Sequence, residues 1–167
     1  MTTYTFYDTD ITGREIYDII GSDYERLLGV CFQYCTSVAM CLYLDANVDV
    51  SEIRRFQIDV TPETKQYFQH YGRFPAGDCN ESGTYQIVRY SLMPEVREFL
   101  LSRADSVFKW TYGWGNKNPD DLVFLRADGS AFFSSVIHEG ECTLSPRDNE
   151  DVSSVVDDPR WLCSVAD

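Results

Sequence analysis

Basic residues, histidines and long apolar runs are all scarce in this sequence. Its 167 residues include 14 Lys and Arg against 27 Asp and Glu, with two histidines, so the formal net charge is −13 at pH 7. Nucleic acid is therefore disfavoured as a direct ligand, because binding phosphates requires basic groups. No apolar run approaches the roughly 18 residues of a membrane span, and the first residues lack the basic start and apolar core of a signal peptide. We expect a cytoplasmic protein without a membrane partner.

The sequence also lacks the compact motifs of common enzyme classes. None of the patterns G-x-x-x-x-G-K-S/T, G-x-G-x-x-G, G-x-S-x-G and H-E-x-x-H occurs, and the six cysteines form no C-x-x-C pair. Without a secretion signal, these cysteines are expected to be reduced. A zinc site would have to collect four ligands from scattered cysteines and the two histidines, so buried free thiols are the preferred interpretation. The sequence thus predicts no metal and no cofactor.

The acidic residues that are present gather at both ends of the chain. Residues 1–50 carry 8 acids and 2 bases, residues 138–167 carry the same numbers, and the middle segment is almost neutral. An acidic surface speeds encounter with a basic protein, although it also simply keeps a protein soluble. On the first interpretation, residues 1–25 and 139–158 are the contact regions. The candidate contact residues are Asp18, Asp23, Glu139, Glu141, Glu150 and Asp151, together with the aromatic residues Tyr112 and Trp114.

Hydrophobic periodicity predicts helices and strands in mixed order. The expected helices are 12–20, 22–35, 61–72, 93–103 and 145–156, and the expected strands are 2–8, 37–44 and 84–92, with a helical turn at 51–56. Thr12 with Glu15 and Ser22 with Glu25 are spaced as capping boxes at the first two helix starts. Asp128–Gly129 joins two apolar runs and is typical of a tight hairpin turn. This order indicates a single α+β domain over residues 1–167, with a mostly antiparallel sheet, helices packed on it, and a C-terminal hairpin followed by a helix.

The segment "WTYGW" offers aromatic side chains for packing or for binding. Trp110, Tyr112 and Trp114 alternate, so on a strand they would line one face. Core packing is expected for Trp110. Trp114 lies between two glycines in an expected loop, and exposed Trp and Tyr are common at protein interfaces. For Trp114, packing and interface contact both remain open.

His138 is the only histidine with acidic neighbours. It precedes Glu139 and Glu141, but on a strand Glu139 would point to the opposite face, and no second histidine is near. We expect His138 to end the second hairpin strand and to hold it through a hydrogen bond. A small hydrolase using a cysteine and His138 is the alternative. Asp120–Asp121 follows Pro119 and is expected to form a turn and strand start rather than a catalytic pair.

Several of these short segments occur together in a familiar order. They are a Trp-containing segment at Trp110 or Trp114, Pro119–Leu122, Asp128–Gly129 between aromatic strands at Phe124 and Phe132–Phe133, and His138–Glu139. This order resembles the C-terminal half of a diffuse group of small bacterial proteins, in which Glu usually stands at the position of Asp120. Proteins of that group resemble toxin-neutralising immunity proteins in size, acidity and architecture. The resemblance implies no particular site residues.

The leading expectation is therefore a non-enzymatic acidic protein that binds another, basic protein. Immunity-type inhibition of a toxin, such as a basic nuclease, is its sharpest form. An acidic mimic of nucleic acid that blocks a defence protein is a second class, and it predicts carboxylates in phosphate-like rows on one face. The hydrolase predicts a deep pocket with His138 and a thiol or carboxylate within hydrogen-bond reach.

Overall fold

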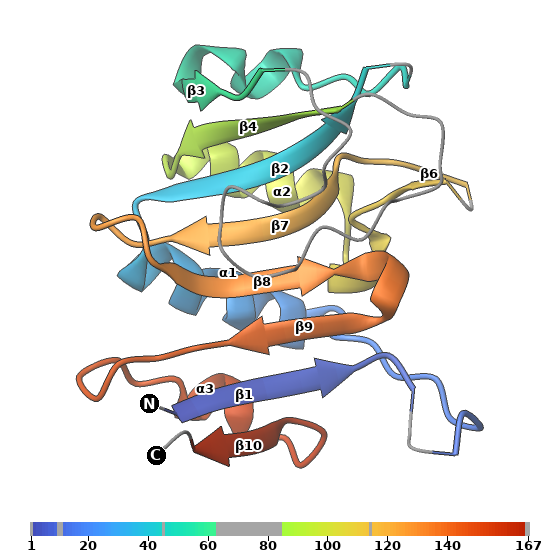
Figure 1. The fold of residues 1–167 in the computed structure, drawn as a ribbon, viewed down its shortest axis with the longest axis vertical. Helices are drawn as coiled ribbons and strands as arrows, with labels where there is room; N and C mark the ends of the chain where they lie inside the picture. Colours follow the sequence, from blue (N-terminus) through green and yellow to red (C-terminus); the bar gives the residue numbers. More distant parts are fainter. Residues whose placement is uncertain (1, 10–11, 45, 63–84, 114, 166–167) are drawn as a thin grey trace.

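The computed structural model describes residues 2–9, 12–44, 46–62, 85–113 and 115–165. Eight strands form one sheet in the order β10-β1-β9-β8-β7-β2-β4-β3, and every neighbouring pair is antiparallel (Figure 1). These strands are β1 Thr2–Tyr7, β2 Ser37–Tyr43, β3 Gln57–Val60, β4 Tyr85–Ser91, β7 Asp120–Leu125, β8 Ala131–Val136, β9 Glu141–Leu144 and β10 Leu162–Val165. Two short strands, β5 Tyr112–Gly113 and β6 Asn116–Lys117, pair separately. The predicted α+β fold with an antiparallel sheet is confirmed.

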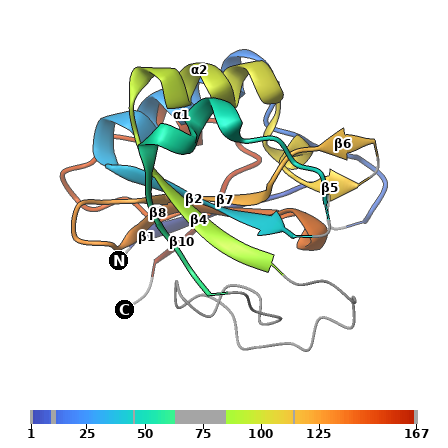
Figure 2. The same cartoon turned by 90° about the horizontal axis from the view of Figure 1, so that it is seen from above.

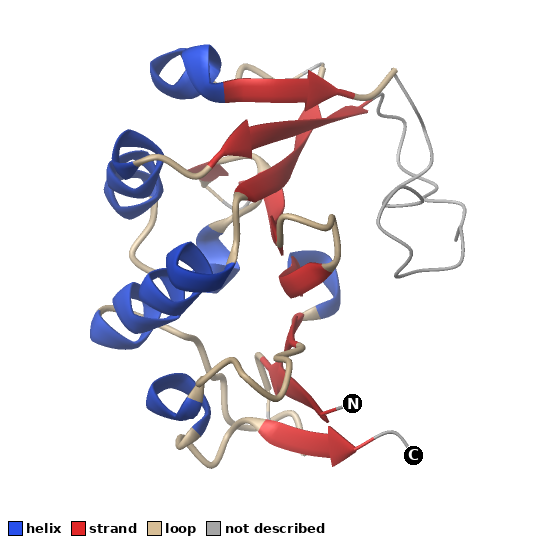
Figure 3. Cartoon of the chain, turned by 90° about the vertical axis from the view of Figure 1, so that its left-hand side faces the viewer, coloured by secondary structure: helices blue, strands red, loops and turns tan. Residues whose placement is uncertain are grey.

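The helices cover one face of this sheet. Figures 2 and 3 show α1 (Ser22–Tyr34), α2 (Pro94–Arg103) and the short α3 (Ser153–Val156) on the same side. Within the part of the chain that the structure describes, the 3₁₀ segments are η1 Ser51–Phe56, η3 Val107–Lys109 and η4 Ile137–Glu139. The largest fully buried side chains between helices and sheet include Trp110, Tyr24, Tyr90, Phe6, Phe124 and Phe132. The core role expected for Trp110 is confirmed. None of the described helices is long and apolar enough to cross a membrane.

The opposite face of the sheet carries a second, smaller apolar cluster. Its buried members come from β2, β4 and β7 and are Ala39, Cys41, Tyr85, Ile87, Val123 and Leu125. The central strands are therefore buried on both faces. This explains why residues 37–44 are almost uniformly apolar instead of alternating.

Most of the expected elements are present. The strands expected at 2–8, 37–44 and 84–92, the helices at 22–35 and 93–103, the helical turn at 51–56 and the hairpin at Asp128–Gly129 are confirmed. The helix expected at 61–72 lies almost entirely outside the described residues, as do His70, Cys79 and Trp114.

The helix predicted for residues 12–20 is wrong. This segment is irregular and forms only isolated bridges, Thr9 with Ile16 and Ile20 with Ser106. The Asp18 carboxylate accepts a hydrogen bond from the Ile19 backbone N–H (2.7 Å), a local bond that competes with helix formation. Ser22 is the first residue of α1 and not its cap, because Gly21, with φ of 56°, precedes the helix and no side chain caps it.

The final helix predicted for residues 145–156 is largely wrong. Only α3 is helical, and the Ser145 N–H bonds to the Phe132 carbonyl at the end of the β8–β9 ladder instead of capping a helix. α3 starts where the Asp151 carboxylate accepts hydrogen bonds from the Ser153 backbone N–H (3.0 Å) and hydroxyl (2.7 Å). The burial expected for Val152 and Val155 is confirmed.

Candidate partner-binding surface

The two acidic ends of the chain meet in one region of the fold. β1 lies between β9 and β10, with Tyr4 opposite Leu144 on one side and Cys163 on the other. α3 packs beside α1 next to these strands (Figure 1). Acidic residues from the start of α1 and from the loop around α3 are therefore neighbours, although they are far apart in the sequence.

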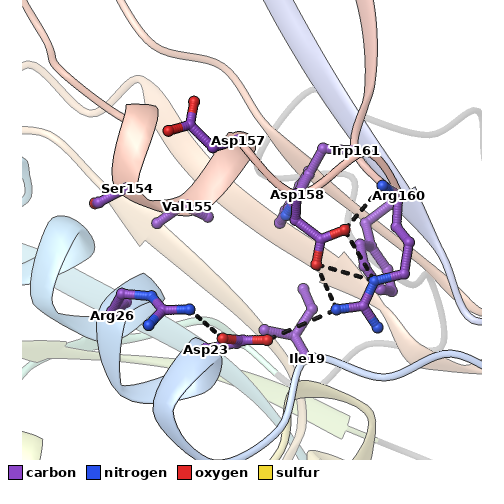
Figure 4. Close-up of a pocket in the computed structure, with 10 residues that line it drawn as sticks. Ile19, Asp23, Arg26, Ser154, Val155, Asp157, Asp158, Arg160 and Trp161 are labelled. Carbon is purple, nitrogen blue, oxygen red and sulfur yellow. Dashed lines mark hydrogen bonds and ion pairs between the residues drawn. The ribbon is translucent and has the colours of Figure 1, made fainter.

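A first hollow of about 340 Å³ lies between α3, the start of α1 and the turn before β10 (Figure 4). Its apolar lining consists of Phe6, Ile19, Val155 and Trp161. Charges alternate across it: Arg26 binds Asp23, Asp23 lies 3.6 Å from Arg160, and the Arg160 Nε donates to both oxygens of Asp158 (3.0 and 2.9 Å). Two cations and two carboxylates therefore balance, and their attraction leaves no excess charge among these four groups.

Arg160 connects several residues around the first hollow. Its guanidinium lies over the rings of Phe6 (5.3 Å) and Tyr17 (5.8 Å), and its bond to Asp158 holds the pKa of that carboxyl below the usual range. Its Nη1 donates to the Asp18 carbonyl (3.4 Å). The Asp18 carboxylate is half-buried and also accepts a hydrogen bond from the Phe108 N–H (3.4 Å), and burial raises its pKa. Asp18, a predicted contact residue, thus serves the internal packing of this loop.

A second hollow of about 540 Å³ lies on the other side of α3. It is lined by Thr2 and Tyr4 of β1, by the continuous run 146–153, and by Val156 and Asp157. Asp157 lines both hollows, and Figure 4 shows its carboxylate directed away from Asp23 and Arg160. The exposed carboxylates of the second hollow are Asp148, Asp151 and Asp157. Its one lining cation among the described residues, Arg147, is bonded to Asp128, so this hollow has an excess of negative charge.

Glu150, a contact residue predicted from the sequence, has internal partners in the structure. Its carboxylate is almost fully buried, and it accepts hydrogen bonds from the Arg126 Nε (2.7 Å) and Nη2 (2.5 Å) and from the Arg147 N–H (2.7 Å). The bond from Arg126 holds the pKa of Glu150 below its usual value. Arg126 also donates to the carbonyls of Ala131 (2.9 Å) and Ser145 (2.7 Å). Glu150 therefore ties the acidic loop to the β7–β8 hairpin.

Glu139 and Glu141, also predicted as contact residues, lie elsewhere in the fold. Glu139 and His138 are exposed in η4, with His138 Nε2 3.5 Å from Glu139 Oε1. Glu141 opens β9 opposite Tyr7, at the strand end remote from the loop that follows Leu144. The structure thus places Asp23 in the first hollow and Asp151 in the second, whereas Glu139 and Glu141 line neither of these two hollows.

Two carboxylates at the start of β7, those of Asp120 and Asp121, are buried, where the sequence predicts only a turn and strand start. Asp121 has φ of 54° at an irregularity in the β2–β7 pairing, is fully buried, and accepts a hydrogen bond from the Ile137 N–H (2.6 Å). It therefore holds the turn that contains His138. His138 lies in this turn rather than at the end of β8, where the sequence predicts it. The sequence offers one signal for the burial of these two acids, because an apolar run follows them directly. An Asp side chain lies in a buried strand only when hydrogen bonds satisfy its carboxylate.

Asp120 forms a small polar site with its neighbours. Burial raises its pKa, while hydrogen bonds from the Tyr112 N–H (2.5 Å) and the Tyr43 and Thr111 hydroxyls, and the nearby charge of His138, act in the opposite direction. Burial and the Asp120 carboxylate raise the pKa of Tyr43. Tyr112, a predicted contact residue, is partly exposed beside Tyr43, with ring centroids 6.4 Å apart. Because the Asp120 carboxylate already accepts three internal hydrogen bonds, its chief role is to attach β5 to the eight-stranded sheet.

Four of the five described cysteines are buried and are therefore poorly suited to nucleophilic catalysis. Cys31, Cys35, Cys41 and Cys142 are buried, and burial raises the pKa of Cys35 to about 12 and that of Cys31 well above its usual value. Only Cys163, on β10, is exposed among the cysteines that the structure describes. Within the same residues, no three His, Cys, Asp or Glu side chains are grouped so as to hold a metal ion.

Thiol labelling tests whether Cys163 is exposed while Cys35 is buried. We expect Cys163→Ser to remove about one equivalent from the thiols that react rapidly with Ellman's reagent in the native protein, because a thiolate must be accessible to attack. Cys35→Ser, the matched control, should leave the rapid phase unchanged. Loss of an equivalent in the Cys35 variant would show that a buried thiol is reactive and would revive the hydrolase alternative.

No protein-family model matches this chain, and no curated protein or solved structure matches it either. The function is therefore inferred from the chemistry of the surface around α3. We call the exposed carboxylates Asp148, Asp151 and Asp157, together with the second hollow, the α3 acidic surface.

Proposed function

We propose that this protein binds a basic protein through the α3 acidic surface. One observation supports this proposal above all. The cations beside the α3 acidic surface are already paired, Arg147 with Asp128 and Arg126 with Glu150. The exposed carboxylates of this surface are therefore in excess. Unbalanced surface charge of one sign attracts a partner of opposite charge and speeds encounter. A net charge of −13 over the whole chain acts in the same direction.

Inhibition of a toxin in the cytoplasm, in the manner of an immunity protein, is the form of this function that we favour. A basic nuclease would present a phosphate-binding site that an acidic surface can occupy. The carboxylates of the α3 acidic surface come from one loop and the end of a four-residue helix. This arrangement supports recognition of a protein more than mimicry of nucleic acid, for which long rows of regularly spaced charges would be required.

A comparison of three baits tests the proposal. The wild type, an Asp148→Lys/Asp157→Lys variant and a Glu98→Lys control are immobilised and exposed to native lysate at low and high salt. We expect a basic protein on the wild type and on the control, lost at high salt, and retained at least about tenfold less by the double variant, because opposed like charges are repulsive. Glu98 is exposed on α2 and does not belong to the α3 acidic surface.

The retained protein is then assayed directly. If it is a nuclease, addition of the wild type in stoichiometric amount should stop its cleavage of plasmid DNA, and the double variant should not. Equal retention by all three baits would contradict the proposed surface. Retention of acidic or neutral proteins only would contradict the proposed class of partner.

A further inference from the structure

We propose that the second hollow receives one long cationic side chain, Arg or Lys, from the basic partner. This assignment rests on the proposed function and names the group that the α3 acidic surface recognises. The hollow has about 540 Å³ and is widely open to solvent, so an extended Arg or Lys side chain has room to enter it.

The lining of the hollow matches the two parts of such a side chain. Tyr4 and Val156 are partly buried and provide apolar surface, whereas Pro146 and Val152 also line the hollow but are almost fully buried. The methylene stem of Lys or Arg packs well on surface of this kind while its charged end stays at the rim. The Tyr4 ring adds an aromatic group of the type that attracts cations.

The charges at the rim select a cation over an anion. Asp148 and Asp157 are exposed there, and Asp157 points away from the balanced charges of the first hollow (Figure 4). Arg147 is the only cation among the described residues that line the second hollow. Its guanidinium is bonded to Asp128 and to the Ser130 hydroxyl (3.0 Å). An incoming anion would therefore meet carboxylates and an engaged arginine, whereas a guanidinium or ammonium would meet carboxylates.

The loop that carries these carboxylates is held before any partner arrives. The Asp151 N–H donates to the Tyr34 hydroxyl of α1 (2.9 Å), and the Arg147 N–H donates to the buried Glu150 (2.7 Å). These bonds anchor the loop near both of its ends. A rim fixed in this way loses little conformational entropy when a ligand binds, which favours recognition of a single side chain.

Titration with small probes, followed by nuclear magnetic resonance of the ¹⁵N-labelled full chain, tests the assignment. N-acetyl-arginine methylamide and N-acetyl-lysine methylamide are the cationic probes, and N-acetyl-citrulline methylamide is the neutral control of nearly the same shape. We expect at least one cationic probe to bind with a dissociation constant of about 1 mM and to shift amide resonances of Thr2, Tyr4 and residues 147–157. The citrulline probe should produce no saturable shift there.

Variants locate the cation within the molecule. Asp157→Asn and Asp148→Asn should each weaken the cationic probe about two- to fivefold, as expected for exposed ion pairs, whereas Glu98→Gln should leave its affinity unchanged. Shifts confined to the first hollow, or equal binding of the citrulline probe, would overturn the assignment. The two proposals can fail separately. A partner retained by both the wild type and Asp157→Asn, with no probe binding, would reject the cation site alone, and probe binding without a basic partner would reject the proposed function alone.

Discussion

Glu150→Leu should lower the free energy of unfolding by about 3 kcal/mol, because it leaves the Arg126 guanidinium buried without a counter-charge. The remaining bonds of Arg126, to the Ser130 hydroxyl and to the carbonyls of Ala131 and Ser145, do not neutralise that charge. Urea denaturation monitored by circular dichroism at pH 7 measures the change. A loss below about 0.5 kcal/mol would show that this pair is effectively solvated, as surface ion pairs are.

The double variant Arg126→Met/Glu150→Leu is the matched control for this result. It should recover most of the lost stability, because replacing both buried partners by apolar groups is often neutral. The pH dependence provides a second control with a definite sign. The folded-state pKa of Glu150 lies below its unfolded value of 4.5, so its contribution is present above pH 4.5 and is lost as the pH falls through the folded pKa. The difference between wild type and Glu150→Gln should therefore shrink in acid.

Asp121→Ala is expected to have the next largest effect, a loss of about 2–4 kcal/mol. Removal of the carboxylate leaves the buried Ile137 N–H without its acceptor, which costs about 1–3 kcal/mol. Alanine is also disfavoured in the left-handed conformation that residue 121 adopts, by about 1 kcal/mol. The same denaturation experiment measures the loss.

Asp121→Asn separates these two contributions from the effect of charge. Asparagine tolerates the left-handed region and keeps an oxygen that can accept the Ile137 N–H, so this variant should lose less than about 1 kcal/mol. If Asn and Ala were equally destabilising, the negative charge of Asp121, and not its geometry, would be what holds the turn at His138.

The elements that the sequence predicted well are those whose signals are local. β2 is a short uniformly apolar run, α2 starts with Pro94, and the hairpin turns at Asp128–Gly129. The helix predicted for residues 12–20 is wrong because isoleucines at helical spacing indicate a buried helix face that does not form. In the structure Ile16 is 86% exposed and Ile20 is 57% exposed, and only Ile19 is buried. β9 and β10 were missed because both pair with β1 from the far end of the chain, which local periodicity does not report.

The candidate surface was predictable in its charge but not in its membership. The excess of acids at both ends is visible in the composition, yet Glu150 and Asp148 are indistinguishable there. Only the fold brings Arg126 to Glu150 and leaves Asp148 exposed. Likewise, nothing local separates Asp23 from Glu139, although one lies beside α3 and the other lies in η4.

The position of β1 between β9 and β10 has a consequence for synthesis of the chain. On the ribosome, β1 emerges long before β9 and β10, the two strands that pair with it. Both edges of β1 therefore stay unpaired until those strands have been synthesised. Pairings of such long range also form slowly, because a large loop has to close before they contribute. Tyr4 joins residues 146–157 only when this closure is complete, so an unfinished chain does not yet carry the surface that we assign to binding. Translation therefore sets the earliest moment at which a newly made molecule can engage its partner.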